Sequence, residues 1–244
     1  MTKKPRPALK AVAKDGNVTS RIVRDLGAAI VAGKFSRKKS FPIEADLCVR
    51  YDASRSVVRE AVKMLTAKGL LAARPRHGTW VQPEENWNLF DPDVLGWAVE
   101  RRPSPSLRQE LGEAQLAVEC AAAALAAVRA SFQQKSAIER ALARIVAAEH
   151  GEDDPLKAGI AFHVAVLRAS GNRFLTQFQQ LIEAALQAGG EAGARRAGSE
   201  DYRRIVEAII AGDADAAYRT TRTVIARDME QPAKGQGGGR AAGR

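Results

Sequence analysis

Two arginines one helical turn apart give this sequence its clearest chemistry. Arg55 and Arg59 follow Ser54, whose hydroxyl can cap a helix by accepting a hydrogen bond from a free backbone N–H of the first turn. Ser56 lies near them at the same end. Guanidinium groups and small hydroxyls at the exposed N-terminal end of a helix suit contacts in the major groove of DNA. The alternative is that both arginines are ordinary solvated charges on a helix surface.

The helix that must position these groups is predicted from its apolar spacing. Val58, Val62 and Leu65 recur at the helical period and define one buried side. The two arginines lie on a different face. Gly69 ends the pattern, as glycine commonly does just after a helix C-terminus.

Short elements are predicted on both sides of this helix. Upstream, residues 42–51 form a short helix that leaves a tight turn before the arginine-bearing helix. Downstream, the strand-like runs 70–73 and 79–81 are joined by a turn at 74–78 with three potentially basic side chains. The order helix, turn, helix and β-hairpin predicts a winged helix-turn-helix domain.

The charge distribution supports the same interpretation. Residues 1–83 hold 18 Lys and Arg against 6 Asp and Glu, a balance of +12. Residues 84–244 hold 20 and 22, a balance of −2. The positive charge is therefore concentrated in the part of the chain that would contact phosphates.

The ordered motifs of this region also resemble a known family. The patterns P-x-E-x-x-L, S-R-x-x-V-R-E-A, G-L-L and R-x-x-H-G-T-W-V, within Val18 to Gln82, resemble the DNA-binding domain of the GntR family of bacterial regulators. The resemblance implies sequence-specific contacts from the start of the arginine-bearing helix and from the wing tip, which would reach the minor groove or the backbone. The residues expected to make them are Ser54, Arg55, Ser56, Val57, Arg59, His77, Gly78 and Thr79.

The fold class predicted for the whole chain is mostly α, with the winged helix-turn-helix followed by an all-α helical-bundle effector domain. No apolar run of 18 or more residues and no signal peptide is seen, so a cytoplasmic protein is expected. Residues 1–17 are expected to be a flexible basic arm, either adding phosphate contacts or merely disordered. The predicted parts are 1–17, the arm; 18–82, the DNA-binding domain; 83–103, a linker; 104–231, the effector-binding and dimerisation domain; and 232–244, a disordered tail.

The linker is unusually apolar. Its prolines and Asn/Asp residues are expected to break helix, and its large side chains are expected to dock on the second domain. The run N-W-N-L-F-D-P-D-V-L-G-W resembles the branch of the GntR family that represses galactonate operons. The apolar residues concerned are Trp87, Leu89, Phe90, Leu95 and Trp97.

The second part of the chain shows repeated helical patterning and no strand signal. Its apolar positions predict helices around 107–125, 138–151, 162–170, 174–186, 205–212 and 217–229, with a Gly-, Ala- and Arg-rich gap at 189–198. The stretches A-F-H-V-A-V-L-R-A-S-G-N and Y-R-R-I-V-E-A-I-I-A-G-D resemble the FCD-type effector domain of the FadR subgroup. That resemblance implies dimerisation and a small carboxylic acid bound inside the bundle, in many members beside a divalent metal held by an aspartate and three histidines.

This sequence departs from that metal pattern. His163 is present, but Gly159 stands where the aspartate would lie one turn earlier, and Tyr202 stands at a histidine position. Gln115 replaces an arginine that would clamp a carboxylate. We therefore expect no metal and no other cofactor. Gln115, His163 and Tyr202 are expected to line a polar effector pocket, and the alternative for His163 is a hydrogen-bonded core histidine.

These features predict a regulator and not an enzyme. No nucleophile elbow, phosphate-binding loop or dinucleotide-binding motif occurs in a suitable context. We expect a homodimer on double-stranded operator DNA, away from any membrane, repressing a sugar-acid, galactonate-like catabolic operon until a small carboxylate or sugar-acid effector releases it. The alternatives are a helical domain that only dimerises, or one that responds to a fatty-acid or lactate-type carboxylate.

Overall fold

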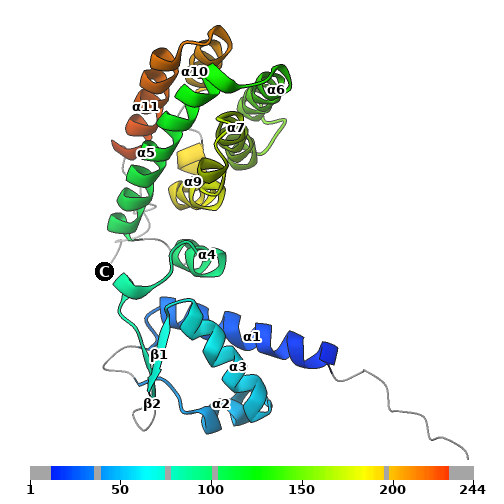
Figure 1. Ribbon diagram of the computed structural model, residues 1–244, viewed down its shortest axis with the longest axis vertical. Helices are drawn as coiled ribbons and strands as arrows, with labels where there is room; N and C mark the ends of the chain where they lie inside the picture. The colour runs from blue at the N-terminus through cyan, green and yellow to red at the C-terminus, as the bar shows by residue number, and fades with distance from the viewer. Residues whose placement is uncertain (1–11, 36–39, 75–77, 101–103, 195–197, 231–244) are drawn as a thin grey trace, which may run out of the picture. The chain divides into compact units, whose positions relative to one another are not determined.

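The computed structural model describes residues 12–35, 40–74, 78–100, 104–194 and 198–230. The chain divides into two compact units, Met1–Arg101 and Arg102–Arg244. The described residues are mainly helical with one two-stranded antiparallel sheet, which confirms the predicted fold class (Figure 1).

The first unit contains the predicted winged helix-turn-helix. Helix α1 (Val12–Val31) packs on α3 (Arg55–Ala67), and α2 (Glu44–Tyr51) precedes α3 across a short turn. Strands β1 (Leu71–Arg74) and β2 (Gly78–Val81) pair antiparallel to form the wing. Apolar side chains from all three helices and β1 form the core: Ile22, Leu26, Ile30, Leu47, Val58, Leu65 and Leu71.

The ends of α3 follow from its sequence. Ser54 caps the helix, because its Oγ accepts from the Val57 backbone N at 3.4 Å. The turn before it contains Asp52 in the left-handed region, with φ 48°. Gly69 ends the helix at φ +77°, and a Cβ there would lie 2.3 Å from the Asn86 carbonyl oxygen. Only glycine therefore allows the later segment to pass so close to the end of α3.

The apolar linker differs from the expectation in both structure and packing. A 3₁₀ turn at Glu84–Asn86 is followed by helix α4 (Pro92–Glu100), which belongs to the first unit and packs on α1. Pro92 can begin this helix because a backbone N–H in the first turn has no acceptor within the helix, so the missing N–H of proline costs no hydrogen bond. The Trp97 ring fills the space over Gly27, where an added Cβ would lie 2.2 Å from the ring. The expectation of a linker without helix was therefore wrong, and Trp97, which was expected to dock on the second domain, packs on α1 of the first unit.

The second unit is an all-α bundle. The longest helix, α5, packs along α11, and α7 packs on α5, α6 and α9 (Figure 1). Fully buried alanines of α5 allow close approach of its neighbours. The helices are α5 (Pro105–Arg129), α6 (Phe132–Glu149), α7 (Pro155–Ala169), α8 (Arg173–Thr176), α9 (Gln179–Ala194), α10 (Ser199–Ala211) and α11 (Ala214–Glu230).

Two other boundaries differ from the sequence expectation. Helix α1 begins at Val12, so residues 12–17 of the expected arm are helical, while residues 1–11 lie outside the described part of the chain. The expected gap at 189–198 is helical as far as Ala194, because alanine, glutamine and glutamate surround its glycines. The expected tail, 232–244, also lies outside the described residues.

Helix α5 is also the one described helix long and apolar enough to cross a membrane by length and composition. Half of its apolar window is buried inside the protein. The buried polar residues Gln115 and Glu119 lie within α5 and bond to one another and, through Glu119, to α7. These features are those of a core helix of a bundle.

Candidate nucleic-acid interface and buried polar cluster

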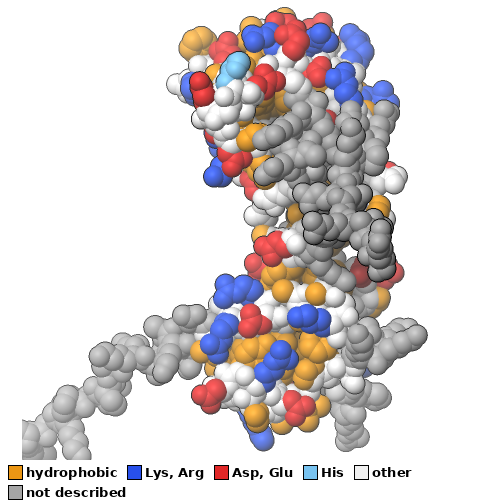
Figure 2. All heavy atoms as spheres, turned by 180° about the vertical axis from the view of Figure 1, so that it is seen from behind, with side chains coloured by type: hydrophobic (Ala, Val, Ile, Leu, Met, Phe, Trp, Pro, Cys, Tyr) orange, Lys and Arg blue, Asp and Glu red, His pale blue; other side chains and the backbone are white. Residues whose placement is uncertain are grey.

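The N-terminal end of α3 presents its polar side chains outward. Ser54, Arg55, Ser56 and Arg59 are all exposed, and the Ser54 and Ser56 hydroxyls lie 2.8 Å apart. Figure 2 shows Lys and Arg side chains beside apolar surface on one face of the first unit. The exposed end of α3 therefore offers both hydroxyls and guanidinium groups to a ligand.

Arg59 is held by the preceding helix. Its Nε donates to Glu44 Oε2 of α2 at 2.9 Å, and its side chain remains 64% exposed. A bond at Nε leaves the terminal nitrogens of the guanidinium group as further donors. The ion pair therefore orients Arg59 while leaving it accessible.

The remaining predicted contact residues have mixed outcomes. Val57 is only 8% exposed and packs in the core of the first unit, so its side chain is not available for base contact and that assignment is corrected. Gly78 is exposed with φ +79°, and Thr79 follows it on β2. His77 lies outside the described residues. Arg74, one of the basic side chains of the predicted turn, was not among the expected contact residues; its guanidinium lies 5.8 Å from the Trp80 ring centroid and so places a positive charge on the wing.

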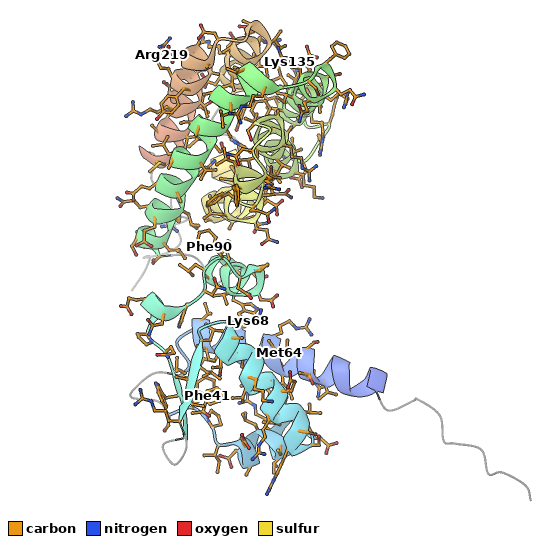
Figure 3. All side chains as sticks on the ribbon, in the orientation of Figure 1. Phe41, Met64, Lys68, Phe90, Lys135 and Arg219 are labelled. Carbon is orange, nitrogen blue, oxygen red and sulfur yellow. The ribbon has the colours of Figure 1, made fainter. Side chains whose placement is uncertain are left out.

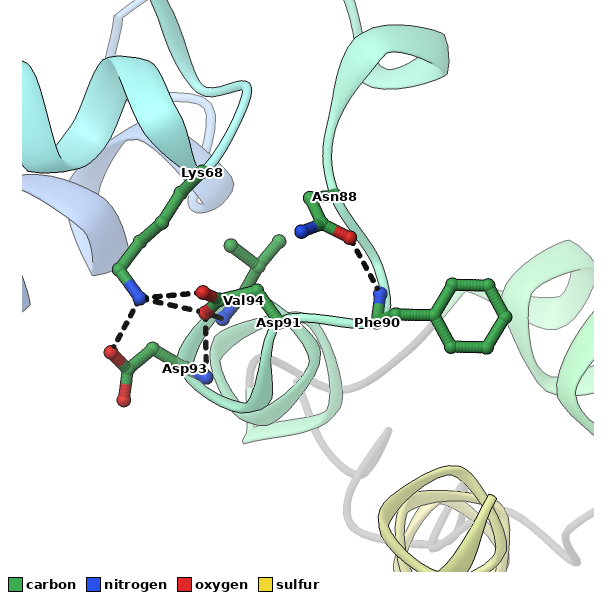
Figure 4. A network of polar contacts seen from close by, with 6 residues as sticks. All are labelled: Lys68, Asn88, Phe90, Asp91, Asp93 and Val94. Carbon is green, nitrogen blue, oxygen red and sulfur yellow. Dashed lines mark hydrogen bonds and ion pairs between the residues drawn. The ribbon is translucent and has the colours of Figure 1, made fainter. Parts of the chain in front are cut away.

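The other end of α3 is tied to the segment that begins α4. Lys68 Nζ donates to both Asp91 oxygens and to Asp93 Oδ2, each at 2.8 Å (Figure 4). Asp91 Oδ1 also accepts from the backbone N of Asp93 and Val94 and so caps α4. Figure 3 shows Lys68 at the end of α3, facing this segment. Helix α4 is thus fixed to α3 by charge as well as to α1 by packing.

A second group of polar residues lies inside the helical bundle. His163 Nδ1 on α7 lies 2.6 Å from Glu119 Oε2 on α5, and His163 Nε2 lies 3.4 Å from the Tyr202 hydroxyl on α10. Gln115 Nε2 donates to Glu119 Oε1 at 3.4 Å. All four side chains are more than nine-tenths buried. We call these four residues, Gln115, Glu119, His163 and Tyr202, the buried polar cluster.

The charges in this cluster follow from its contacts. Burial alone would lower the pKa of His163, but the charge and hydrogen bond of Glu119, helped by Asp228, raise it above its ordinary value. Burial raises the pKa of Tyr202, and nearby carboxylates raise it further. The Glu119 carboxylate therefore favours the protonated form of the His163 imidazole, and Tyr202 keeps its proton at neutral pH.

The residues present do not fit a divalent metal. Gly159, at the position where a ligand aspartate would stand, offers no donor atom, and Tyr202 contributes a neutral hydroxyl. His163 Nδ1 is taken by Glu119. Among the residues that the structure describes, no group of three or more His, Cys, Asp or Glu is arranged to hold an ion.

The cluster contains all three predicted pocket residues and one that the sequence analysis missed. Gln115 and His163 both contact Glu119, and Tyr202 contacts His163, so the three predicted residues come together from three helices. The available signal was an acidic residue one turn after Gln115, in an otherwise Ala-rich helix. Beside the cluster, Gly159 is buried, yet an added Cβ would have no atom within 4 Å. Position 159, one turn before His163 on α7, therefore has room for a small side chain.

Known proteins resemble both units. The family described as "Bacterial regulatory proteins, gntR family" matches residues 18–81, and the FCD domain matches residues 110–227. The galactonate operon transcriptional repressor of Escherichia coli K12 is 34% identical over 217 residues, covering 86% of this chain and 94% of that protein. A putative L-lactate dehydrogenase operon regulatory protein of Escherichia coli K12 is 28% identical, covering 73% of this chain and 72% of the relative.

A solved structure agrees in fold. Lar, which controls the agr system of Listeria monocytogenes, is similar over 93% of this chain and 97% of its own chain, with a TM-score of 0.53 and 16% identity. The family matches and the long alignment with the galactonate operon repressor agree with the winged helix and the bundle described above. The chain therefore belongs to the GntR family of bacterial regulatory proteins and is a DNA-binding transcriptional regulator with an FCD domain.

Proposed function

We propose that this regulator is a cytoplasmic repressor of a sugar-acid catabolic operon, released from its operator by a small carboxylate effector. The observation that carries this proposal is the 34% identity with a galactonate operon repressor across 94% of that protein. The identity extends through both the winged helix and the bundle, so it supports a shared mode of regulation and not only a shared DNA-binding domain.

The DNA-reading surface comprises the exposed end of α3 and the wing. Ser54, Arg55, Ser56 and Arg59 approach base edges and phosphates, while Gly78 and Thr79, with His77, contact the minor groove or the backbone. Glu44 holds Arg59 at its Nε, which limits the number of orientations that the side chain must lose on binding.

The regulator acts as a homodimer through its helical domain. Helix-turn-helix dimers place two recognition helices about one turn of DNA apart, so the operator is a pseudo-palindrome with matching half-site spacing. Effector binding in the bundle favours one spacing of the two winged helices over the other. Release requires that the effector bind the two arrangements with different affinity.

The test begins with selection of bound sequences from a random DNA pool by the full-length protein. A pseudo-palindromic consensus is expected. The Arg55→Ala variant serves for comparison and should bind that consensus more weakly than the unaltered protein. Titration of D-galactonate into the complex is expected to release the DNA, with L-lactate and a medium-chain fatty acid as comparison ligands. Release by L-lactate alone would favour the function suggested by the 28% identical lactate-operon relative. A consensus without release by any of the three would refute the sugar-acid response.

A further inference from the structure

Arg59 lies in the proposed DNA-reading surface together with an acidic partner. Its Nε donates at 2.9 Å to Oε2 of Glu44, which stands 15 positions earlier in the chain, on α2. The side chains of Arg59 and Glu44 are 64% and 40% exposed. An ion pair this exposed contributes little to stability, because water screens it. Stability of the fold therefore does not explain why an acidic side chain lies on a surface that must approach phosphates, which repel it.

The helix dipole of α2 does not require the contact either. Glu44 and Asp46 both lie in the first turn of α2, where acidic side chains interact favourably with the N-terminal end of the helix. A carboxylate satisfies that preference without reaching another helix. The Glu44 side chain instead extends to α3 and bonds to Arg59. The contact is therefore best explained by its effect on Arg59.

The position of the carboxylate decides which edge of the guanidinium group is free. A guanidinium group can make paired hydrogen bonds along an edge that includes Nε, or along the edge formed by its two terminal nitrogens. Glu44 occupies Nε, so the edge formed by Nη1 and Nη2 of Arg59 remains. Two parallel donors on that edge match the O6 and N7 acceptors of guanine in the major groove. The contact thus leaves Arg59 with a donor pattern that suits guanine.

The charge of Glu44 has a second effect on Arg59. A carboxylate 2.9 Å from the guanidinium group offsets its positive charge, so the pair attracts a phosphate less than an unpaired arginine does. Hydrogen bonds to a base edge depend on the direction of the donors more than on net charge. Phosphate contacts carry no direct sequence information, whereas base-edge contacts do. Pairing with Glu44 therefore shifts Arg59 from general DNA attraction toward base readout.

We propose that Glu44 is a positioning residue for sequence readout: it holds Arg59 in the orientation that reads a guanine and lowers the attraction of Arg59 to phosphates. This inference rests on the proposed DNA-reading surface and assigns one of its residues a base and a partner. Glu44 thereby weakens binding to DNA in general and strengthens the preference for the operator.

The experiment measures binding of the full-length protein to the selected consensus duplex, to its single-base-pair variants and to a shuffled duplex of the same composition. Fluorescence anisotropy at several KCl concentrations gives both the affinity and its salt dependence. Arg59→Ala identifies the base pair that Arg59 reads, as the position where discrimination falls by about 5- to 150-fold. Glu44→Ala should lower discrimination at that same base pair by at least about fivefold. It should also bind the shuffled duplex more tightly and steepen the salt dependence by about 0.9 per winged helix.

Further variants separate orientation from charge. Glu44→Gln removes the charge but keeps an oxygen that can accept from Arg59 Nε, so it should steepen the salt dependence while keeping most of the discrimination. Asp46→Asn is the matched control, because it removes an exposed charge from the same turn of α2, and it should leave discrimination unchanged. Glu44→Ala added to Arg59→Ala should cause no further loss of discrimination, because the effect passes through Arg59. Thermal unfolding of the first unit checks that each variant is folded.

The outcomes distinguish this inference from the proposed function. Full discrimination in Glu44→Ala, or an equal loss in Asp46→Asn, would overturn the positioning role while leaving Arg59 as a base-reading residue. Additive losses in the Glu44→Ala and Arg59→Ala double variant would overturn it as well. If Arg59→Ala keeps its discrimination at every base pair, the proposed DNA-reading role of Arg59 falls, and the inference falls with it.

Discussion

Replacing Lys68 with methionine should loosen helix α4 from the winged helix. The ammonium group bonds to Asp91, whose side chain is 19% exposed, and to Asp93, which is 59% exposed, while Lys68 itself is 13% exposed. A largely buried hydrogen bond to a charged group contributes about 1.5–3 kcal/mol, and a solvent-screened pair contributes less than about 1 kcal/mol. Lys68→Met should therefore destabilise the first unit by about 2–3 kcal/mol.

The matched control is Asp93→Asn, which removes only the exposed partner and should cost less than about 1 kcal/mol. Thermal unfolding followed by circular dichroism would give the change in stability, and amide hydrogen exchange would show whether α4 opens first. At about 4–8 °C per kcal/mol for a unit of this size, Lys68→Met should lower the first transition by roughly 10 °C or more. Equal and small effects of the two variants would refute the idea that the Lys68 contacts hold α4.

Four further results are expected. Gly27→Ala should destabilise the first unit by about 1–3 kcal/mol in urea unfolding, because the new methyl would meet the Trp97 ring; a smaller residue at position 97 should restore stability. Arg55→Ala should cost about 1–3 kcal/mol of operator affinity in gel-shift titrations if it reads a base, with relaxed specificity; an equal loss on every sequence would mark a phosphate contact. Because Glu119 raises the pKa of His163 above 6.5, the His163–Glu119 ion pair stabilises the second unit fully below pH 6.5 and loses this effect as the pH rises through the raised pKa. His163→Gln should therefore make the melting temperature of the second unit depend less on pH in thermal scans. Burial, and next the charge of Glu119, raise the pKa of Cys120 to about 11, so a thiol reagent at pH 8 should modify it only on unfolding.

Much of the fold could be predicted because its signals are local. The Ser54 cap, the spacing of Val58, Val62 and Leu65, and Gly69 specify α3 without reference to any distant residue. The same holds for most helices of the bundle, where apolar side chains recur at the helical period. Gln115, His163 and Tyr202 could be selected as a group only through the family resemblance, and their contacts bear out their proximity.

The errors arose where distant segments decide the outcome. Val57 lies among exposed residues in sequence, but its position on α3 turns it into the core. The apolar side chains of the linker required a partner, and nothing in their spacing distinguishes α1 from the second domain as that partner. Glu119 was overlooked because its importance depends on His163, which is 44 residues away in the chain.

The packing of Trp97 over Gly27 determines where the DNA-binding unit could be joined to a different effector domain in a chimeric regulator. The family match for the DNA-binding region ends at residue 81, before α4 begins. A chimera joined there would lose Val94, Leu95 and Trp97, expose the face of α1 that they cover, and leave Lys68 without its aspartates. A transplantable DNA-reading module should therefore extend through Glu100, and hybrids joined after that residue should remain soluble, whereas those joined after Val81 should aggregate.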